Sequence, residues 1–163
     1  MKNYVIKQRL FNLWRSSFYI KNEQDVDSFF VKSDAHLLAR LTIYDMDNQP
    51  LVKIKKRYFR ILPRYDVCTP NGDLIFAVKS RFTIFTKKLK VVSKNPEFDG
   101  MKIKGNILAW EFDVNKDENI VARISKKILR IADSYCVAIA DEANTILYLA
   151  LAIIVDCVHH KKR

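Results

Sequence analysis

The side chains that could perform catalysis or bind a metal are few and scattered along this sequence. One group of possible metal ligands lies near the C-terminus: Asp156, Cys157, His159 and His160. Its spacing fits no usual zinc site, and adjacent histidines on a helix do not share a face. Ser134 follows Asp133, yet neither a glycine elbow nor an oxyanion motif accompanies it, and His36 is distant in the sequence. With three glycines in all, a Gly-rich phosphate loop is excluded as well. We therefore expect no catalytic residue, no metal and no cofactor in a protein that is not an enzyme.

Positive charge is the chemistry that this sequence offers in quantity. The chain carries 29 basic and 18 acidic residues, for a net charge of +11. Such an excess attracts polyanions, which include nucleic acid, acidic proteins and anionic membrane surfaces, and it does not choose among them. The plain alternative is a basic but solvated surface that has no specific partner.

The length and the cysteines indicate a single cytoplasmic domain. A chain of 163 residues with 49% apolar residues is long enough to bury a substantial core. Cys68, Cys136 and Cys157 are odd in number and lie in apolar stretches, which favours reduced, buried thiols over a disulfide framework. The N-terminus lacks the apolar core of a signal peptide. We expect one domain over residues 1–163.

Between Tyr4 and Ser125 the dominant period of the apolar side chains is two, which is typical of β-strands. The strand-like segments are separated by turn-forming clusters at Asn22–Asp27, Asp45–Pro50, Thr69–Asp73, Asn95–Gly100 and Asn115–Asn119. Similar segments start 22 to 24 residues apart, so the repeating unit is a hairpin. Five and a half hairpins and an opening strand at Tyr4–Gln8 make twelve strands over about residues 4–139.

An apolar C-terminal segment completes the predicted fold. Ile146–Val155 is a run of ten apolar residues without alternation, which predicts a helix over about 142–158 with Asp141 or Asn144 as its N-cap. It is shorter than the roughly 20 residues that span a bilayer. A propeller or a solenoid would fit the repeat less well than a barrel, and twelve strands enclose more space than their own side chains fill. We therefore predict a mainly β fold, a twelve-stranded closed antiparallel β-barrel around a central hydrophobic C-terminal α-helix. Its interior is filled by Leu147, Leu151 and Ile154, so that any binding site lies on the outside or the rim.

Basic residues recur near the end of the second strand of each predicted hairpin. Every second strand of a meander runs in the same direction, so these residues should gather towards one end of the barrel as a broken basic collar. The alternation in Lys53-Ile54-Lys55 and Lys102-Ile103-Lys104 turns the lysines outward. The candidate anion-binding or lipid-binding residues are Lys53, Lys55, Arg57, Lys79, Arg81, Lys102 and Lys104. The alternative is that these are ordinary solvated strand positions, whose lysines discourage edge pairing.

The chain also resembles the LURP-one-related family, whose relatives include the tubby C-terminal domain and the phospholipid scramblases. The resemblance covers essentially the whole chain and ends with the apolar helix that finishes at Asp156. It rests on the segments Tyr4–Phe11, Phe18–Gln24, Leu62–Val67, Ile103–Asn106, Val121–Lys127 and Asp133–Val137. The resemblance implies a twelve-stranded barrel around a central helix. Tubby domains bind phosphoinositide head groups through basic residues. The chain lacks the acidic calcium loop, so calcium-triggered lipid scrambling is not implied.

Three functions remain open at this point. The leading hypothesis is a non-catalytic binding or scaffold domain, a monomer that binds anionic phospholipid head groups or phosphoinositides at a membrane surface. The alternatives are a module that recognises an acidic protein, and a small-ligand or catalytic protein that uses a cleft at the barrel rim. Aromatic residues interleave with arginines between Lys53 and Tyr65, but no recognised nucleic-acid module accompanies them, so we expect no specific nucleic-acid partner.

Overall fold

The computed structural model of the chain contains twelve strands and one long helix. It describes residues 1–7, 17–34, 40–58, 61–82, 87–106, 109–126, 134–140 and 142–159. The strands are β1 Lys2–Lys7, β2 Phe18–Asn22, β3 Asp27–Asp34, β4 Arg40–Tyr44, β5 Pro50–Arg57, β6 Arg64–Cys68, β7 Leu74–Phe82, β8 Lys87–Val92, β9 Lys102–Asn106, β10 Glu111–Lys116, β11 Asn119–Ser125 and β12 Ser134–Ile139. A 3₁₀ turn, η2 Glu142–Asn144, leads into α1 Thr145–His159.

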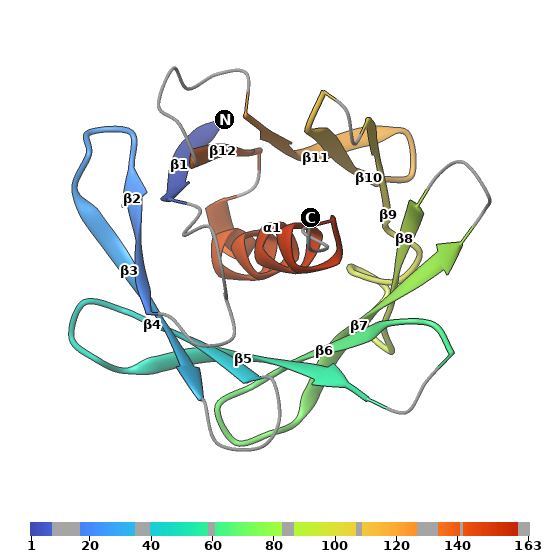
Figure 1. The fold of residues 1–163 in the computed structure, drawn as a ribbon, viewed down its shortest axis with the longest axis horizontal. Coiled ribbons are helices and arrows are strands. Elements are labelled where there is room, and N and C mark those ends of the chain that lie inside the picture. Colours follow the sequence, from blue (N-terminus) through green and yellow to red (C-terminus); the bar gives the residue numbers. More distant parts are fainter. Residues whose placement is uncertain are drawn as a thin grey trace.

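The strands form a closed barrel. Each strand pairs antiparallel with the next one along the chain, and β12 pairs with β1 to remove both edges (Figure 1). Buried and exposed side chains alternate in the first half of β9, where Lys102 and Lys104 are exposed and Ile103 is buried. The predicted fold class, a twelve-stranded antiparallel barrel around a C-terminal helix, is confirmed.

The hairpin turns depend on residues that tolerate a left-handed backbone. Asp25, Asn48 and Asp117 have φ angles of 63°, 62° and 54°, and Gly72 has a φ of 103°. Asp, Asn and Gly adopt this region at the lowest cost, which explains why they end the strands here. The Asp45 carboxylate also accepts hydrogen bonds from two backbone amides of its own turn. The turn chemistry therefore fixes where the strands of these four hairpins reverse.

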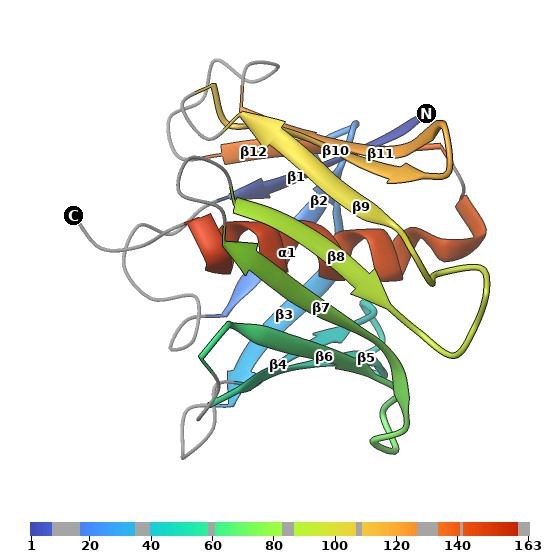
Figure 2. The same ribbon diagram turned by 90° about the vertical axis from the view of Figure 1, so that its right-hand side faces the viewer.

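The barrel has two ends that differ in which connections they carry. The Lys2 ammonium at the start of β1 lies 3.5 Å from the Glu142 carboxylate, so this end is the one where α1 begins. The β2–β3, β4–β5, β6–β7, β8–β9 and β10–β11 hairpins lie at the same end, because connections alternate between the ends of a meander (Figure 2). The β5–β6 connection therefore lies at the opposite end, where α1 finishes.

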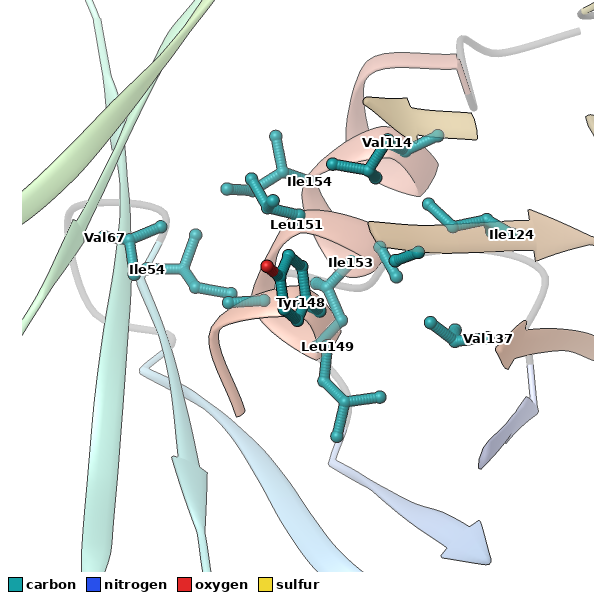
Figure 3. Close-up of a cluster of buried hydrophobic side chains, with 14 of the residues drawn as sticks. Ile54, Val67, Val114, Ile124, Val137, Tyr148, Leu149, Leu151, Ile153 and Ile154 are labelled. Atoms are coloured by element: carbon teal, nitrogen blue, oxygen red, sulfur yellow. The ribbon is translucent and has the colours of Figure 1, made fainter. Parts of the chain in front are cut away.

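The helix α1 fills the barrel. Eleven of its fifteen residues are buried, and the inward side chains of the strands surround it (Figure 3). Of the three residues predicted to fill the interior, Leu151 and Ile154 are fully buried, whereas Leu147 is only partly buried and packs against the same core. By length and composition alone, Glu142–His159 could also cross a membrane, although 61% of this window is buried inside the barrel. An all-round apolar helix is therefore accommodated by protein rather than by lipid.

The start of α1 differs slightly from the prediction. The residues from Glu142 to Asn144 form the 3₁₀ turn, and the α-helix begins at Thr145. Asn144 lies immediately before α1 and its Nδ2 donates a hydrogen bond to Oε1 of Glu97, 2.6 Å away, which ties the helix start to the β8–β9 loop. Asp141, the other predicted N-cap, lies outside the described residues.

Candidate functional site

Five basic side chains form a row across five neighbouring strands of the barrel wall. Each one is the registered partner of the next, from β5 to β9. We call this set the basic row: Arg57, Arg64, Lys79, Lys90 and Lys102. Neighbouring strands lie about 4.8 Å apart, so the row extends over roughly 20 Å.

The basic row faces away from α1. Residues that flank the row along its strands, such as Tyr65, Val78 and Val91, are buried against the core, and successive side chains of a strand point to opposite faces. Arg57, Lys79 and Lys102 are exposed, and the other two members are partly buried. Like charges directly opposite each other on a sheet are destabilising, so a row of such pairs costs stability.

A single buried carboxylate holds one end of the basic row in place. Oδ2 of Asp66 accepts a hydrogen bond from Nε of Arg57 at 2.5 Å, and Oδ1 accepts one from Nε of Arg64 at 2.7 Å. The Asp66 side chain is only 2% exposed, whereas that of Arg57 is 56% exposed. Burial would raise the pKa of Asp66, but the hydrogen bonds and charges of the two arginines outweigh it and lower this pKa. Asp66 is therefore ionised, and each guanidinium keeps further N–H donors beyond its Nε.

The structure brings together some of the predicted anion-binding residues and separates others. Arg57, Lys79 and Lys102 belong to the basic row, and Lys104 lies beside it on β9, opposite Asp113. Arg81 follows in β7, and its side chain lies outside the described part of the structure. The basic residues thus follow the register across β5–β9. Whether they bind anions stays a prediction.

Lys53 and Lys55 are directed elsewhere. Nζ of Lys53 donates a hydrogen bond to the carbonyl oxygen of Pro70 at 2.6 Å, which fastens β5 to the β6–β7 turn. Nζ of Lys55 lies 3.9 Å from the place of a Cβ at Gly72, in the same turn. Both side chains point outward as predicted, but Lys53 contributes to a turn contact rather than to the row.

Sequence reasoning missed Arg64 and Lys90. Both lie on the first strand of their hairpins, whereas the predicted set came from second strands. Their signal in the sequence is the alternation of Arg64-Tyr65 and of Leu89-Lys90-Val91, which assigns both basic side chains to the outer face. Their membership of the row depends on the register with β5, β7 and β9, which alternation does not supply.

The scattered residues that could do other chemistry are not brought into a catalytic arrangement within the described part of the chain. Burial raises the pKa of the Cys68, Cys136 and Cys157 thiols, which disfavours the reactive thiolate. His159 ends α1 and its ring stacks on Phe112 at a centroid distance of 4.7 Å. No group of three or more His, Cys, Asp or Glu side chains that could hold a metal occurs among the described residues. His36, Asp133 and His160 lie outside them.

These observations define a class of protein, a β-barrel that closes around its own C-terminal helix and presents a cationic outer wall. The chain belongs to the LURP-one-related family, whose model matches residues 2–156. It is 29% identical over 154 residues to the uncharacterized protein YxjI of Bacillus subtilis (strain 168), a match that covers 94% of this chain and 91% of that protein. An X-ray structure of a protein from Arabidopsis thaliana is similar in fold, with a TM-score of 0.64, 19% identity, and coverage of 95% of this chain and 91% of that one.

Proposed function

We propose that this chain is a non-catalytic binding domain whose basic row contacts the phosphate groups of anionic phospholipids at a membrane surface. The observation that carries the proposal is the registered row of five cations on β5–β9. Like-charged neighbours oppose folding, and an anionic ligand would relieve that repulsion. Guanidinium and ammonium donors at neighbouring strand positions suit phosphate oxygens.

The shape of the row favours a surface over a single small anion. A length of roughly 20 Å exceeds one phosphate group and matches several adjacent lipid head groups. Each basic residue near an anionic leaflet contributes about 1 kcal/mol to binding. The row follows the curved wall of a closed barrel, so a flat membrane meets neighbouring members of the row rather than all five at once. Salt weakens their contribution, because the Debye length is about 10 Å at 0.1 M.

Vesicle co-sedimentation with a matched pair of double variants tests the proposal. Lys79→Glu/Lys90→Glu reverses the centre of the row, while Lys2→Glu/Lys21→Glu reverses two lysines on β1 and β2, away from the row and at the end of the barrel where α1 begins (Figure 1). Both lower the net charge from +11 to +7, so they differ only in where the charge is lost. Losing two contacts of about 1 kcal/mol each corresponds to binding about 30-fold weaker.

We expect the unmodified protein to sediment with vesicles that contain about 20% phosphatidylserine in phosphatidylcholine, and not with pure phosphatidylcholine. The row variant should lose that binding, and the control variant should keep most of it. Equal recovery with neutral and anionic vesicles at low salt would refute membrane binding. Equal losses in both variants would show that net charge, and not the row, determines binding.

A further inference from the structure

The β5–β6 connection joins two members of the basic row. β5 ends at Arg57 and β6 begins at Arg64, and these two residues are registered partners. Between them the connection 58–63 carries Tyr58, Ile61 and Leu62, whose exposed fractions are 45%, 101% and 40%. We call these three side chains the apolar tip. The tip and the first two cations of the row are thus one continuous surface.

The exposed apolar side chains of the described residues are concentrated at the apolar tip. The described residues include eight exposed large apolar side chains, and three of them lie in this one short connection. Single exposed apolar residues are ordinary on protein surfaces, whereas a group that is rimmed by charged residues marks a place of interaction. Ile61 contributes the most, because its side chain is fully exposed to water.

The base of the apolar tip is held in position. Asp66 binds Arg57 and Arg64 at the two ends of the connection. The carbonyl oxygen of Pro63 accepts a hydrogen bond from the backbone N–H of Ser80 at 3.1 Å, which fastens the connection to β7. At its other end the Lys56 ammonium lies 5.4 Å from the centre of the Tyr58 ring, within cation–π range. The tip is therefore presented on a fixed support, which lowers the entropy lost on binding.

An apolar group surrounded by cations has the chemistry of the lipid–water interface. Tyrosine side chains prefer the level of the head groups, and arginine and lysine pair with lipid phosphates while aliphatic side chains enter the acyl region. We propose that the apolar tip inserts into the bilayer while the end of the basic row beside it, Arg57 and Arg64, contacts the head groups, so that the α1 C-terminal end of the barrel faces the membrane. This inference rests on the proposed function, and it adds the depth and the orientation of binding.

A matched pair of variants separates insertion from charge attraction. Ile61→Ser/Leu62→Ser makes the tip polar without changing any charge. Val26→Ser/Met46→Ser makes the same kind of change at the β2–β3 and β4–β5 hairpins, whose apolar side chains are 55% and 52% exposed at the other end of the barrel. All four side chains lie outside the core, so the variants should fold, and circular dichroism checks that they do.

Vesicle flotation with phosphatidylserine in phosphatidylcholine at about 0.1 M and about 0.5 M salt gives the first readout. Salt weakens the contacts of the basic row, but it does not weaken apolar insertion. We expect the tip variant to bind about tenfold more weakly than the unmodified protein at both salt concentrations, because the apolar contribution that it loses does not depend on salt. The hairpin variant should bind within about twofold of the unmodified protein.

Tryptophan fluorescence of an Ile61→Trp variant gives the second readout. Anionic vesicles should shift its emission to the blue, and lipids with brominated acyl chains should quench it, relative to the unmodified protein. Undiminished binding of the tip variant together with an unshifted emission would overturn insertion and leave surface binding by the basic row intact. Absence of any binding to anionic vesicles would overturn both proposals.

Discussion

Two ion pairs of the outer wall share the same short Nε–Oδ1 contact but differ in burial, which allows the effect of burial on a salt bridge to be measured. Asp66 binds Arg64 through an Nε–Oδ1 distance of 2.7 Å, and Asp113 binds Arg123 through the same two atoms at the same distance. The Asp66 side chain is 2% exposed and that of Asp113 is 34% exposed. Replacement of each aspartate by asparagine keeps the size of the side chain and removes its charge. The two variants thus differ in solvent access, and in that Asp66→Asn also removes the partner of a second, exposed arginine, Arg57.

We expect Asp66→Asn to destabilise the protein by about 2 kcal/mol. A hydrogen bond to a charged group contributes about 1.5–3 kcal/mol, and most of the expected loss comes from the bond to Arg64. The bond to Arg57 adds little, because solvent screens this exposed side chain. For a chain of this size, about 1 kcal/mol changes the melting temperature by about 2–4 °C, which predicts a loss of about 4–8 °C. Asp113→Asn should cause no measurable loss, because exposed ion pairs contribute little.

The pH dependence has a definite sign. The pKa of Asp66 is lower in the folded protein than in the unfolded chain, where it is about 3.9. Its contribution to stability is therefore present above that unfolded value and is lost as the pH falls through the folded pKa. Thermal melts followed by circular dichroism should show a gap between Asp66→Asn and the unmodified protein at neutral pH that closes in acid. Equal melting temperatures for the two asparagine variants at neutral pH would refute the reasoning.

Three further substitutions test the packing of the barrel, all by urea denaturation. Leu151→Ala should cost about 2–5 kcal/mol because its side chain is fully buried in α1, and Leu147→Ala should cost less because its side chain is only partly buried. Gly105→Ala should cost about 1–3 kcal/mol, since a Cβ there would overlap the carbonyl oxygen of Glu111 and the Phe112 ring. An unchanged midpoint for Gly105→Ala, or equal losses at the two leucines, would contradict this description of the core.

The fold could be predicted because its determinants are local in the sequence. A period of two identifies a strand without knowledge of its partner, and Asp, Asn and Gly at the turns indicate where it reverses. All twelve strands follow from these signals, with bounds that differ by a few residues, as at β3, which extends over Asp27–Asp34 instead of Phe29–Lys32. The ten apolar residues of Ile146–Val155 likewise predict a buried helix, whichever strands surround it.

The basic row could not be predicted in the same way, because it depends on register. Alternation assigns Lys53 and Arg57 to the same outer face, but only the pairing of β5 with β6 places Lys53 opposite Cys68 and Arg57 opposite Arg64. A register shift between Val67 and Cys68 then changes the pairing of β6 with β7. A bulge of this kind adds one residue to one strand of a pair, so every residue beyond it faces a different partner on the neighbouring strand. The hairpin period in the sequence does not reveal where such a bulge occurs.

The position of α1 constrains where this protein can act. Because α1 occupies the interior, a binding surface is expected on the outer wall or the rim, where every functional side chain must be exposed at some cost to stability. Asp66 reduces that cost without cancelling the positive charge of the surface, since its one negative charge fixes two arginines while the row as a whole remains strongly positive. A fully neutralised wall would be more stable and would attract no anion. The uneven balance of charge on β5–β9 is therefore the strongest argument that this surface binds an anionic partner.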